Sequence, residues 1–393
     1  MRFLPYSRQN IDKDDIKNVL KVLKSDFITQ GPQISNFEKN FAKYVGSKYA
    51  LACATGTAAL HLSCLALGIG KNQNILTSPI TFVASANCGE FVGAKTHFVD
   101  IDKKNFCLSP YHLEEKLKKI KIDLVVVVHM SGHSAEMEKI YKLKKKYKFY
   151  LIEDACHALG GKYSKKKVGS CNYSDLSTFS FHPVKPITTG EGGMITTNNK
   201  TIYEKLLVFR THGIHKNPIK FENNNIAFDK EGNPNRWYYE MSNLGYNYRI
   251  TDLQAALGNS QLKKLDKFTS IRNKIAKIYN KGFKNNEFIT IPTVQKHVKH
   301  AYHLYTILVD FNAINKSRNQ VMNELAKINI GTQVLYIPVF LQPYYKKKYN
   351  YKVEGFQNSI EYYNQALSIP IFTSLKKSEV NYVIKKINKI IKK

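Results

Sequence analysis

One lysine of the chain stands in an unusual backbone setting. Lys185 lies between two prolines in "HPVKPITTGEGG", after an apolar run and before a glycine-rich bend. A solvated lysine needs neither the fixed backbone angle of proline nor the freedom of glycine, whereas a lysine held at one angle inside a site could use both. Burial would lower its pKa and make its amine a nucleophile or a base. Lys185 is therefore a candidate catalytic residue, whereas we interpret its neighbour His182 as structural.

A second candidate follows an apolar run. In "FYLIEDACHALGG", two acids, a cysteine and a histidine come at the end of a segment with the composition of a buried strand. Ligands of α/β proteins bind at the carboxyl ends of strands, so Asp154 is placed to contact one. Two alternatives stay open: Asp154 could cap the following turn, and His157 could be an ordinary hydrogen-bonded histidine.

A third stretch, "ACATGTAALHL", runs from an expected strand through Thr55-Gly56-Thr57 into an expected helix. The free N–H groups and the dipole of the helix start then converge on one point, which suits a phosphate. A simple glycine turn is the alternative. Together, a constrained lysine, a strand-end aspartate and a phosphate turn are the three groups that a pyridoxal phosphate enzyme needs, because the aspartate keeps the pyridine nitrogen protonated.

The elements that must position these residues alternate over about the first 280 residues between apolar runs and helical patterns, which is typical of a mostly parallel sheet covered on both faces. Strands are expected at residues 49–54, 74–78, 95–100, 123–129, 149–154, 177–181 and 192–197. Helices are expected at residues 14–25, 57–67, 137–147 and 251–279.

The pattern changes after about residue 290. It predicts a strand at 303–311, a helix at 318–329, a strand at 331–339 and a helix at 378–393. The fold class is therefore α/β. We expect a large domain at 1–285, with a mostly parallel central sheet, an N-terminal helix and a long connecting helix, and a smaller C-terminal α+β domain at 286–393.

The composition limits the partners and the compartment. The chain has 60 Lys and Arg against 30 Asp and Glu. The lysines are spread over most expected helices, so they indicate solvated faces, and we expect no nucleic-acid partner. Six cysteines without metal-site spacing predict no metal site and a reducing compartment. Without a signal-like or spanning apolar run, we expect no membrane partner and a cytoplasmic protein.

Six segments, in order, resemble one family: "ATGTAALHL", "TSPITFVASAN", "EDACHALG", "SFHPVKPITTGEGGMITTN", "FRTHGI" and "GYNYRITDLQAALG". They are similar to the DegT-type nucleotide-sugar aminotransferases, which are pyridoxal-phosphate-dependent transferases of fold type I. The resemblance implies that Lys185 forms the Schiff base with the cofactor, that Asp154 pairs with the pyridine nitrogen and that His157 reaches the phenolic oxygen. It further implies that the cofactor ring lies between Phe82 and Cys156, and that the phosphate is held by Gly56, Thr57 and Ser180.

The resemblance also implies a homodimer with shared active sites. Asn247, in "GYNYRI", matches an asparagine that reaches the phosphate of the neighbouring subunit in relatives. Arg249, two residues on, could face an anionic substrate on the same side of an extended segment. A structural salt bridge is its alternative.

Several segments, including "DFITQGPQISNFEKNF" and "YIPVFLQPYY", resemble one branch more closely, the transaminases of pseudaminic acid biosynthesis. This implies transfer of the amino group of L-glutamate to the C4 keto group of a UDP-2-acetamido-2,6-dideoxy-4-hexulose, giving UDP-4-amino-4,6-dideoxy-N-acetyl-β-L-altrosamine, with Tyr336 near the substrate. Leu335 and Phe340 stand where the branch usually has histidines, and both are expected near the sugar pocket.

Three alternatives remain. The substrate could be another UDP- or dTDP-4-keto sugar, for example one leading to legionaminic acid or bacillosamine. A sugar dehydratase of this fold is the second, but related deoxygenating enzymes have a histidine where this chain has Lys185. A non-catalytic, basic nucleic-acid-binding relative is the third, and retention of the lysine and the aspartate argues against it.

Overall fold

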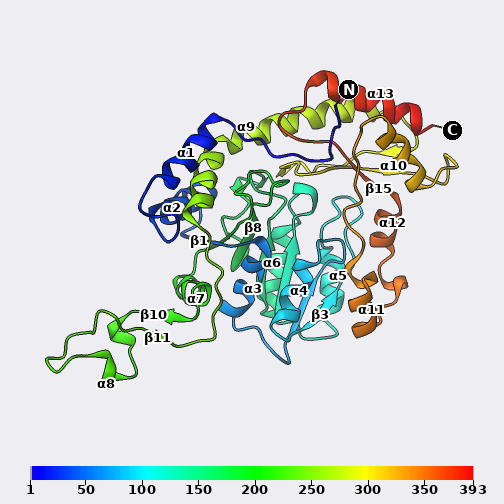
Figure 1. Cartoon of the computed structure of the whole chain (residues 1–393). Coiled ribbons are helices and arrows are strands. Elements are labelled where there is room, and N and C mark those ends of the chain that lie inside the picture. Colours follow the sequence, from blue (N-terminus) through cyan, green and yellow to red (C-terminus); the bar gives the residue numbers. More distant parts are fainter. Residues whose placement is uncertain (1, 393) are drawn as a thin grey trace.

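A computed structural model describes residues 2–392 and contains a seven-stranded sheet at its centre (Figure 1). The strand order is β1-β9-β8-β5-β4-β2-β3. All strands are parallel except β9, which pairs antiparallel with both neighbours. The strands are β1 (Tyr49–Cys53), β2 (Asn74–Thr77), β3 (Lys95–Phe98), β4 (Leu124–Val128), β5 (Tyr150–Asp154), β8 (Leu176–Ser180) and β9 (Gly193–Thr197).

Both faces of this sheet are buried, as in doubly covered α/β sheets. In β4, Leu124 and Val126 face one hydrophobic cluster, while Val125 and Val127 face another. The first face is covered by α3 (Gly56–Ala66), α4 (Ala84–Phe91) and α7 (Lys200–Arg210), and the second by α2 (Pro32–Val45), α5 (Pro110–Leu117), α6 (Met137–Tyr147) and part of α9 (Asp252–Phe283). This burial accounts for the continuous apolar runs of the strands.

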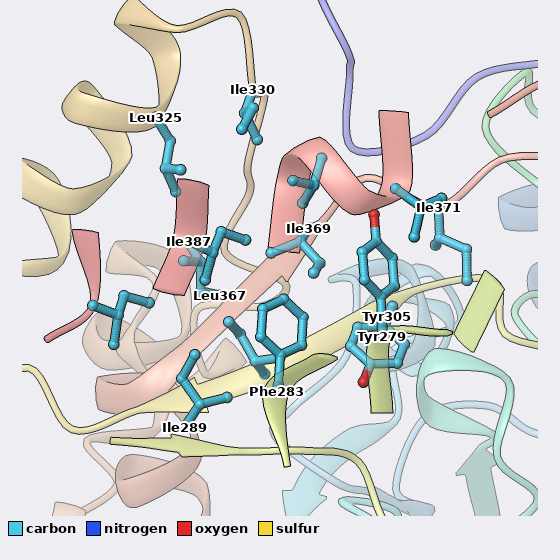
Figure 2. Packing of buried hydrophobic residues seen from close by; sticks show 14 of the residues in the cluster. Tyr279, Phe283, Ile289, Tyr305, Leu325, Ile330, Leu367, Ile369, Ile371 and Ile387 are labelled. Atoms are coloured by element: carbon cyan, nitrogen blue, oxygen red, sulfur yellow. The ribbon is translucent and has the colours of Figure 1, made fainter. Parts of the chain in front are cut away.

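The 32-residue helix α9 joins the sheet to a second core. Its amino-terminal half packs on α2 and on α1 (Lys13–Leu23), whereas Tyr279 and Phe283 enter the second core (Figure 2). That core is built on a three-stranded antiparallel sheet, with α10 and α13 packed around it (Figure 1). Its elements are β12 (Ile289–Thr290), β14 (Tyr305–Val309), β15 (Ala366–Ile369), α10 (Arg318–Lys327) and α13 (Lys377–Ile390).

Shorter elements complete the chain. A hairpin of β10 (Ile214–His215) and β11 (Glu240–Met241), with α8 (Asn224–Ala227), projects away from the body of the molecule (Figure 1). A small three-stranded sheet has the order β13-β6-β7. After α10 the chain leaves the second core for α11, which packs near α4 and β3, and it returns through α12 to β15. These elements are β6 (Lys162–Tyr163), β7 (Lys166–Lys167), β13 (Val298–Lys299), α11 (Pro343–Tyr349) and α12 (Gln357–Gln365), with 3-10 turns at Met130–Gly132, Pro218–Lys220, Val339–Leu341 and Val353–Gly355.

The seven strands expected in the large sheet are present within two residues of their expected bounds. The strand expected at 331–339 is wrong. That segment is irregular and has one isolated bridge, between Gln333 and Ser368, so the third strand of the second sheet is β15. The boundary at residue 285 stays a prediction, although Leu4 lies in the second core. Among residues 2–392 we find no helix that could span a membrane.

Candidate active site

A cavity of about 490 Å³ opens at the carboxyl ends of the parallel strands. Its walls come from the start of α3, the turn before α4, the end of β5, the loop after β8 and the segment after Gly331. Nine of the residues expected at the site line it together: Gly56, Thr57, Phe82, Asp154, Cys156, His157, Ser180, Lys185 and Tyr336. The fold thus brings together residues that lie more than 250 positions apart in the sequence, such as Gly56 and Tyr336.

The start of α3 forms one end of this cavity. Thr55 caps the helix, because its hydroxyl accepts the N–H of Ala58 at 3.0 Å. The preceding N–H groups are the ones that a helix start leaves for an anion. Gly56 lies so close to Ser180 that a Cβ on it would come within 2.8 Å of the Ser180 Cβ. Glycine is therefore required where this helix start meets the end of β8, and a cradle for a phosphate results.

Asp154 is buried at the end of β5, with its carboxylate held from two sides. Its Oδ2 accepts the Ser85 hydroxyl at 2.6 Å, and its Oδ1 accepts the N–H of Cys156 at 3.2 Å. A carboxylate has about four acceptor positions, so capacity remains for a donor in the cavity. The turn-capping alternative considered from the sequence is thus partly correct for the same residue that lines the cavity.

Lys185 lies in a loop tied down at several points. Its own N–H donates to His182 O at 2.9 Å, and the Ser7 hydroxyl donates to Val184 O at 3.0 Å. The side chain is partly exposed because it faces the cavity. Burial of the amine lowers the pKa of Lys185, and the nearby Cys156 and Asp154 oppose this shift only in part. The neutral amine that a nucleophile or base requires is therefore easier to reach than in a solvated lysine.

His157 and Tyr336 form a second polar wall. The His157 Nε2 lies 3.1 Å from the Tyr336 hydroxyl, and the rings are nearly parallel. Burial, assisted by the charge of Lys185, holds the pKa of His157 well below its ordinary value, so the ring is neutral. Its Nδ1 is buried without a hydrogen-bond partner. An unsatisfied buried nitrogen is costly, so this atom indicates a missing ligand or water.

The cavity also has two candidate surfaces for a flat ring. Phe82 is 55% exposed although it follows the buried Thr81, because it faces the cavity. Cys156 lies on the same cavity wall as Asp154, and burial together with the Asp154 charge raises the pKa of its thiol well above the ordinary value. This thiol is therefore a small neutral surface and not a nucleophile.

Two expected residues lie elsewhere. Asn247 is exposed and forms an isolated bridge with Thr211, outside the cavity of its own chain. Arg249 lines a separate, smaller hollow of about 250 Å³ together with Glu38 and Arg210. The ion pair of this hollow joins Arg210 and Glu38 at 2.7 Å, so the salt-bridge alternative for Arg249 finds no support among the described residues.

Leu335 and Phe340, the two positions that differ from the resembled branch, lie in different surroundings. Leu335 lines the cavity as expected, but the expectation for Phe340 is wrong. The Phe340 ring is fully buried and stacks on Phe356 at 4.5 Å, in a separate cluster on the outer side of α4. His182, interpreted as structural, lies exposed on the cavity wall.

Other residues of the site were not identified from the sequence. Tyr6, Leu60, Thr81, Val184 and Glu191 also line the cavity. The opening "PYSRQNIDKDDI" also resembles the pseudaminic acid branch, but the sequence assigned no role to Tyr6. The backbone of Tyr6 is held by a hydrogen bond from the N–H of Ile371 to its carbonyl at 3.0 Å. Taken together, the α3 cradle, the free acceptor capacity of Asp154, the lysine of lowered pKa and the unsatisfied His157 nitrogen fit pyridoxal phosphate, a flat, anionic aldehyde.

Comparison with known proteins places this geometry in a family. The DegT/DnrJ/EryC1/StrS aminotransferase family matches residues 9–388. A UDP-4-amino-4,6-dideoxy-N-acetyl-β-L-altrosamine transaminase of Campylobacter jejuni is 39% identical, covering 97% of this chain and 95% of that one. The spore coat polysaccharide biosynthesis protein SpsC of Bacillus subtilis is 37% identical, covering 99% and 97%.

Solved structures agree with this assignment. Helicobacter pylori PseC, an aminotransferase involved in pseudaminic acid biosynthesis, superposes with a TM-score of 0.89 at 31% identity, covering 99% of both chains. The pyridoxal phosphate form of a putative sugar aminotransferase of Streptococcus pneumoniae superposes with a TM-score of 0.88 at 25% identity, covering 99% of this chain and 98% of that one. The chain therefore belongs to the DegT/DnrJ/EryC1/StrS aminotransferase family and is a pyridoxal-phosphate-dependent nucleotide-sugar aminotransferase.

Proposed function

We propose that the chain transfers the amino group of L-glutamate to the C4 keto group of a UDP-2-acetamido-2,6-dideoxy-4-hexulose, giving UDP-4-amino-4,6-dideoxy-N-acetyl-β-L-altrosamine. The observation that carries this proposal is the match over 97% of the chain to the Campylobacter jejuni transaminase named for that product. The likeness to PseC along the whole chain supports it. The product would serve pseudaminic acid biosynthesis.

In this proposal, the cavity residues divide the binding of the cofactor. The start of α3 with Gly56, Thr57 and Ser180 holds the phosphate, and Phe82 and Cys156 contact the two faces of the ring. Asp154 accepts a hydrogen bond from the pyridine nitrogen. Pyridoxal phosphate, when bound, supplies a sink for the electron pair left when a C–H bond next to the amino group breaks.

Lys185 has two tasks in the proposed reaction. Its amine holds the cofactor covalently at rest and is freed when the amino donor replaces it. The freed Nζ would then move the proton from the α-carbon of glutamate to C4′ of the cofactor, and in the second half-reaction it would move a proton from C4′ to C4 of the sugar. Both tasks need the neutral amine, which burial in the cavity favours.

His157 and Tyr336 are proposed to act by position. The neutral His157 ring, on the cavity wall, is proposed to hydrogen-bond the phenolic oxygen of the cofactor. Its Nδ1 has no hydrogen-bond partner among residues 2–392. Tyr336 lies next to it and is proposed to contact the sugar. Because the Tyr336 pKa is raised by burial, its hydroxyl stays a neutral donor.

We further propose that two copies share their active sites. Asn247 is exposed beyond the cavity of its own chain, which suits a residue that reaches the phosphate of a partner's cofactor. Arg249 is proposed to face an anionic substrate from the same segment. Sedimentation analysis tests the dimer. A mixture of inactive Lys185→Ala and Asn247→Ala chains that regains activity would support the sharing of sites, since one of the mixed sites is complete.

The substrate is tested with a panel of keto sugars. Purified enzyme is supplied with L-glutamate and, in separate reactions, UDP-, dTDP- and GDP-linked 4-keto-6-deoxy sugars, and kcat/KM is measured from 2-oxoglutarate release. We expect the UDP-2-acetamido-2,6-dideoxy-4-hexulose to be preferred by at least about 100-fold, about 2.7 kcal/mol of discrimination. Preference for another keto sugar would contradict the proposal.

A second candidate is an aminotransferase for a different UDP- or dTDP-4-keto sugar. The observation that favours it is the 37% identity to SpsC, which is named for spore coat polysaccharide biosynthesis. Leu335 on the cavity wall, in place of an expected histidine, also points to a changed sugar contact. The same panel distinguishes the two candidates.

A further inference from the structure

We infer that Thr81 and Ser85 form a hydrogen-bond relay that positions Asp154 for the cofactor. The segment "TFVAS" would then position both Asp154 at the pyridine nitrogen and Phe82 on one face of the ring. This inference rests on the proposed role of Asp154. It does not depend on which sugar accepts the amino group.

The direction of the relay follows from counting protons. The Ser85 hydroxyl donates to Asp154 Oδ2 at 2.6 Å, within the range of a charge-assisted O–H···O⁻ bond. A serine has one hydroxyl proton, so its oxygen can only accept from Thr81, whose Oγ1 lies 2.8 Å away. Thr81 therefore donates to Ser85, which donates to Asp154.

Burial makes this relay effective. Ser85 is fully buried and does not line the cavity, so water cannot replace its bond to Asp154 without rearrangement. Thr81 is 2% exposed and Asp154 is 6% exposed. Hydrogen bonds polarise one another more strongly in such surroundings than in water. The remaining contact of the carboxylate, with the N–H of Cys156, fixes its other oxygen. Together these bonds leave the carboxylate one orientation relative to the cavity.

The same four-residue spacing also places Phe82. Thr81 lies in the bend just before α4 and Ser85 is its second residue, and the Ser85 N–H donates to Phe82 O at 3.2 Å. Phe82 is thereby turned outward into the cavity while the two hydroxyls point inward. The positions of Phe82, the candidate for stacking on the ring, and of Ser85, the donor to Asp154, are thus both set by the start of α4.

The test combines substitutions at both ends of the relay. Ser85→Ala removes the donor to Asp154, and Thr81→Val removes the donor to Ser85 with little change in volume. Thr81→Ser keeps the hydroxyl and serves as the rescue. Ser63→Ala is the matched control, because Ser63 is a buried serine whose hydroxyl donates only to the backbone of its own helix, at 2.7 Å to Ala59 O.

Two quantities are measured on each folded variant: the dissociation constant of pyridoxal phosphate from titration of the apoenzyme, and kcat and KM for the glutamate half-reaction in single turnover. For Ser85→Ala we expect the dissociation constant to rise and kcat to fall by about 10-fold or more, which is the usual effect of losing a hydrogen bond to a charged group. KM for glutamate should stay within about two-fold, because Ser85 does not face the donor. Thr81→Val should give a smaller effect of the same kind, and Thr81→Ser and Ser63→Ala should resemble the wild type.

A double-mutant cycle separates positioning from general damage. In the Asp154→Asn background, Ser85→Ala should add less than about two-fold, because the residue through which it acts is already lost. Wild-type affinity and kcat in both Ser85→Ala and Thr81→Val, or full additivity with Asp154→Asn, would overturn the inference. If Ser85→Ala does not fold, Thr81→Val against Thr81→Ser decides. Failure of the sugar assignment would leave these half-reaction results unchanged.

Discussion

Replacing Gly56 by alanine tests the phosphate cradle. The new Cβ would meet the Ser180 Cβ at 2.8 Å and the Ser180 Cα at 3.3 Å. Carbon atoms pack at about 3.5–4.0 Å, so the start of α3 and the end of β8 must separate by about 0.7 Å or more. These two elements are proposed to bind the phosphate from two sides. The substitution therefore widens the proposed phosphate site.

The expected magnitudes differ for stability and for binding. Overpacking costs about 1–3 kcal/mol, whereas alanine in place of glycine in a helix returns up to about 1 kcal/mol. The free energy of unfolding of the apoenzyme should thus fall by about 0–3 kcal/mol. Loss of one hydrogen bond to the charged phosphate should weaken cofactor binding by about 10-fold to 100-fold.

The assay is titration of the apoenzyme with pyridoxal phosphate, beside urea unfolding of the same sample. Gly258→Ala is the matched control. Its Cβ would meet the Phe37 ring at 2.6 Å, so the core of α2 and α9 is overpacked away from the cavity. It should lose stability and keep its cofactor affinity. A Gly56→Ala enzyme that binds the cofactor as tightly as the wild type would refute the cradle.

Three further predictions concern buried polar groups. Glu153 accepts His129 Nε2 at 2.8 Å, and although burial opposes its ionisation, His129 and two serine hydroxyls outweigh this and lower the pKa of Glu153. Its contribution is thus present at neutral pH and lost as the pH falls below 4.5 and through the lowered pKa. Glu153→Gln should cost about 3 kcal/mol at pH 7 in urea unfolding, and less below pH 4; an equal loss at both pH values would contradict this. Burial lowers the pKa of six histidines below 6.5, namely His61, His97, His133, His157, His300 and His303. As the pH falls, these histidines take up protons in the unfolded chain at a higher pH than in the folded chain. The free energy of unfolding should therefore fall between pH 7.5 and 5.5, by up to about 1.4 kcal/mol per pH unit for each histidine. His303→Gln should reduce this dependence on pH. Arg272 is 2% exposed and donates to three backbone carbonyls, those of Tyr302, His303 and Ile371. Arg272→Met leaves these acceptors unpaired and should lower the melting temperature without changing KM for glutamate, whereas an unchanged melting temperature would show that the carbonyls find other donors.

Much of the large domain could be predicted because its signals are local. Fully buried parallel strands such as β4 read as continuous apolar runs, and β5 ends at Asp154, the acid that lines the cavity. The residues around Lys185 carry their constraint in the sequence itself, as two prolines and a run of glycines. The cofactor was therefore predictable from three short stretches.

The predictions that failed concern features that tertiary contacts decide and local sequence does not. The segment 331–339 has the apolar composition of a strand, but Tyr336 is turned to the cavity and the partner strand position is taken by β15. Phe340 was expected near the sugar pocket because it stands where the resembled branch usually has a histidine, whereas its ring is buried against Phe356. Ser85 contacts Asp154 across 69 residues, and no local pattern marks such a pair.

The most direct test of the central claim is to find the lysine that holds the cofactor. The wild-type enzyme is saturated with pyridoxal phosphate, reduced with borohydride to fix the carbon–nitrogen double bond, digested and mapped by mass spectrometry. The structure predicts that the cofactor is attached to the peptide containing Lys185 and that Lys185→Ala yields no labelled peptide. Attachment to a different lysine in the wild type would contradict the account.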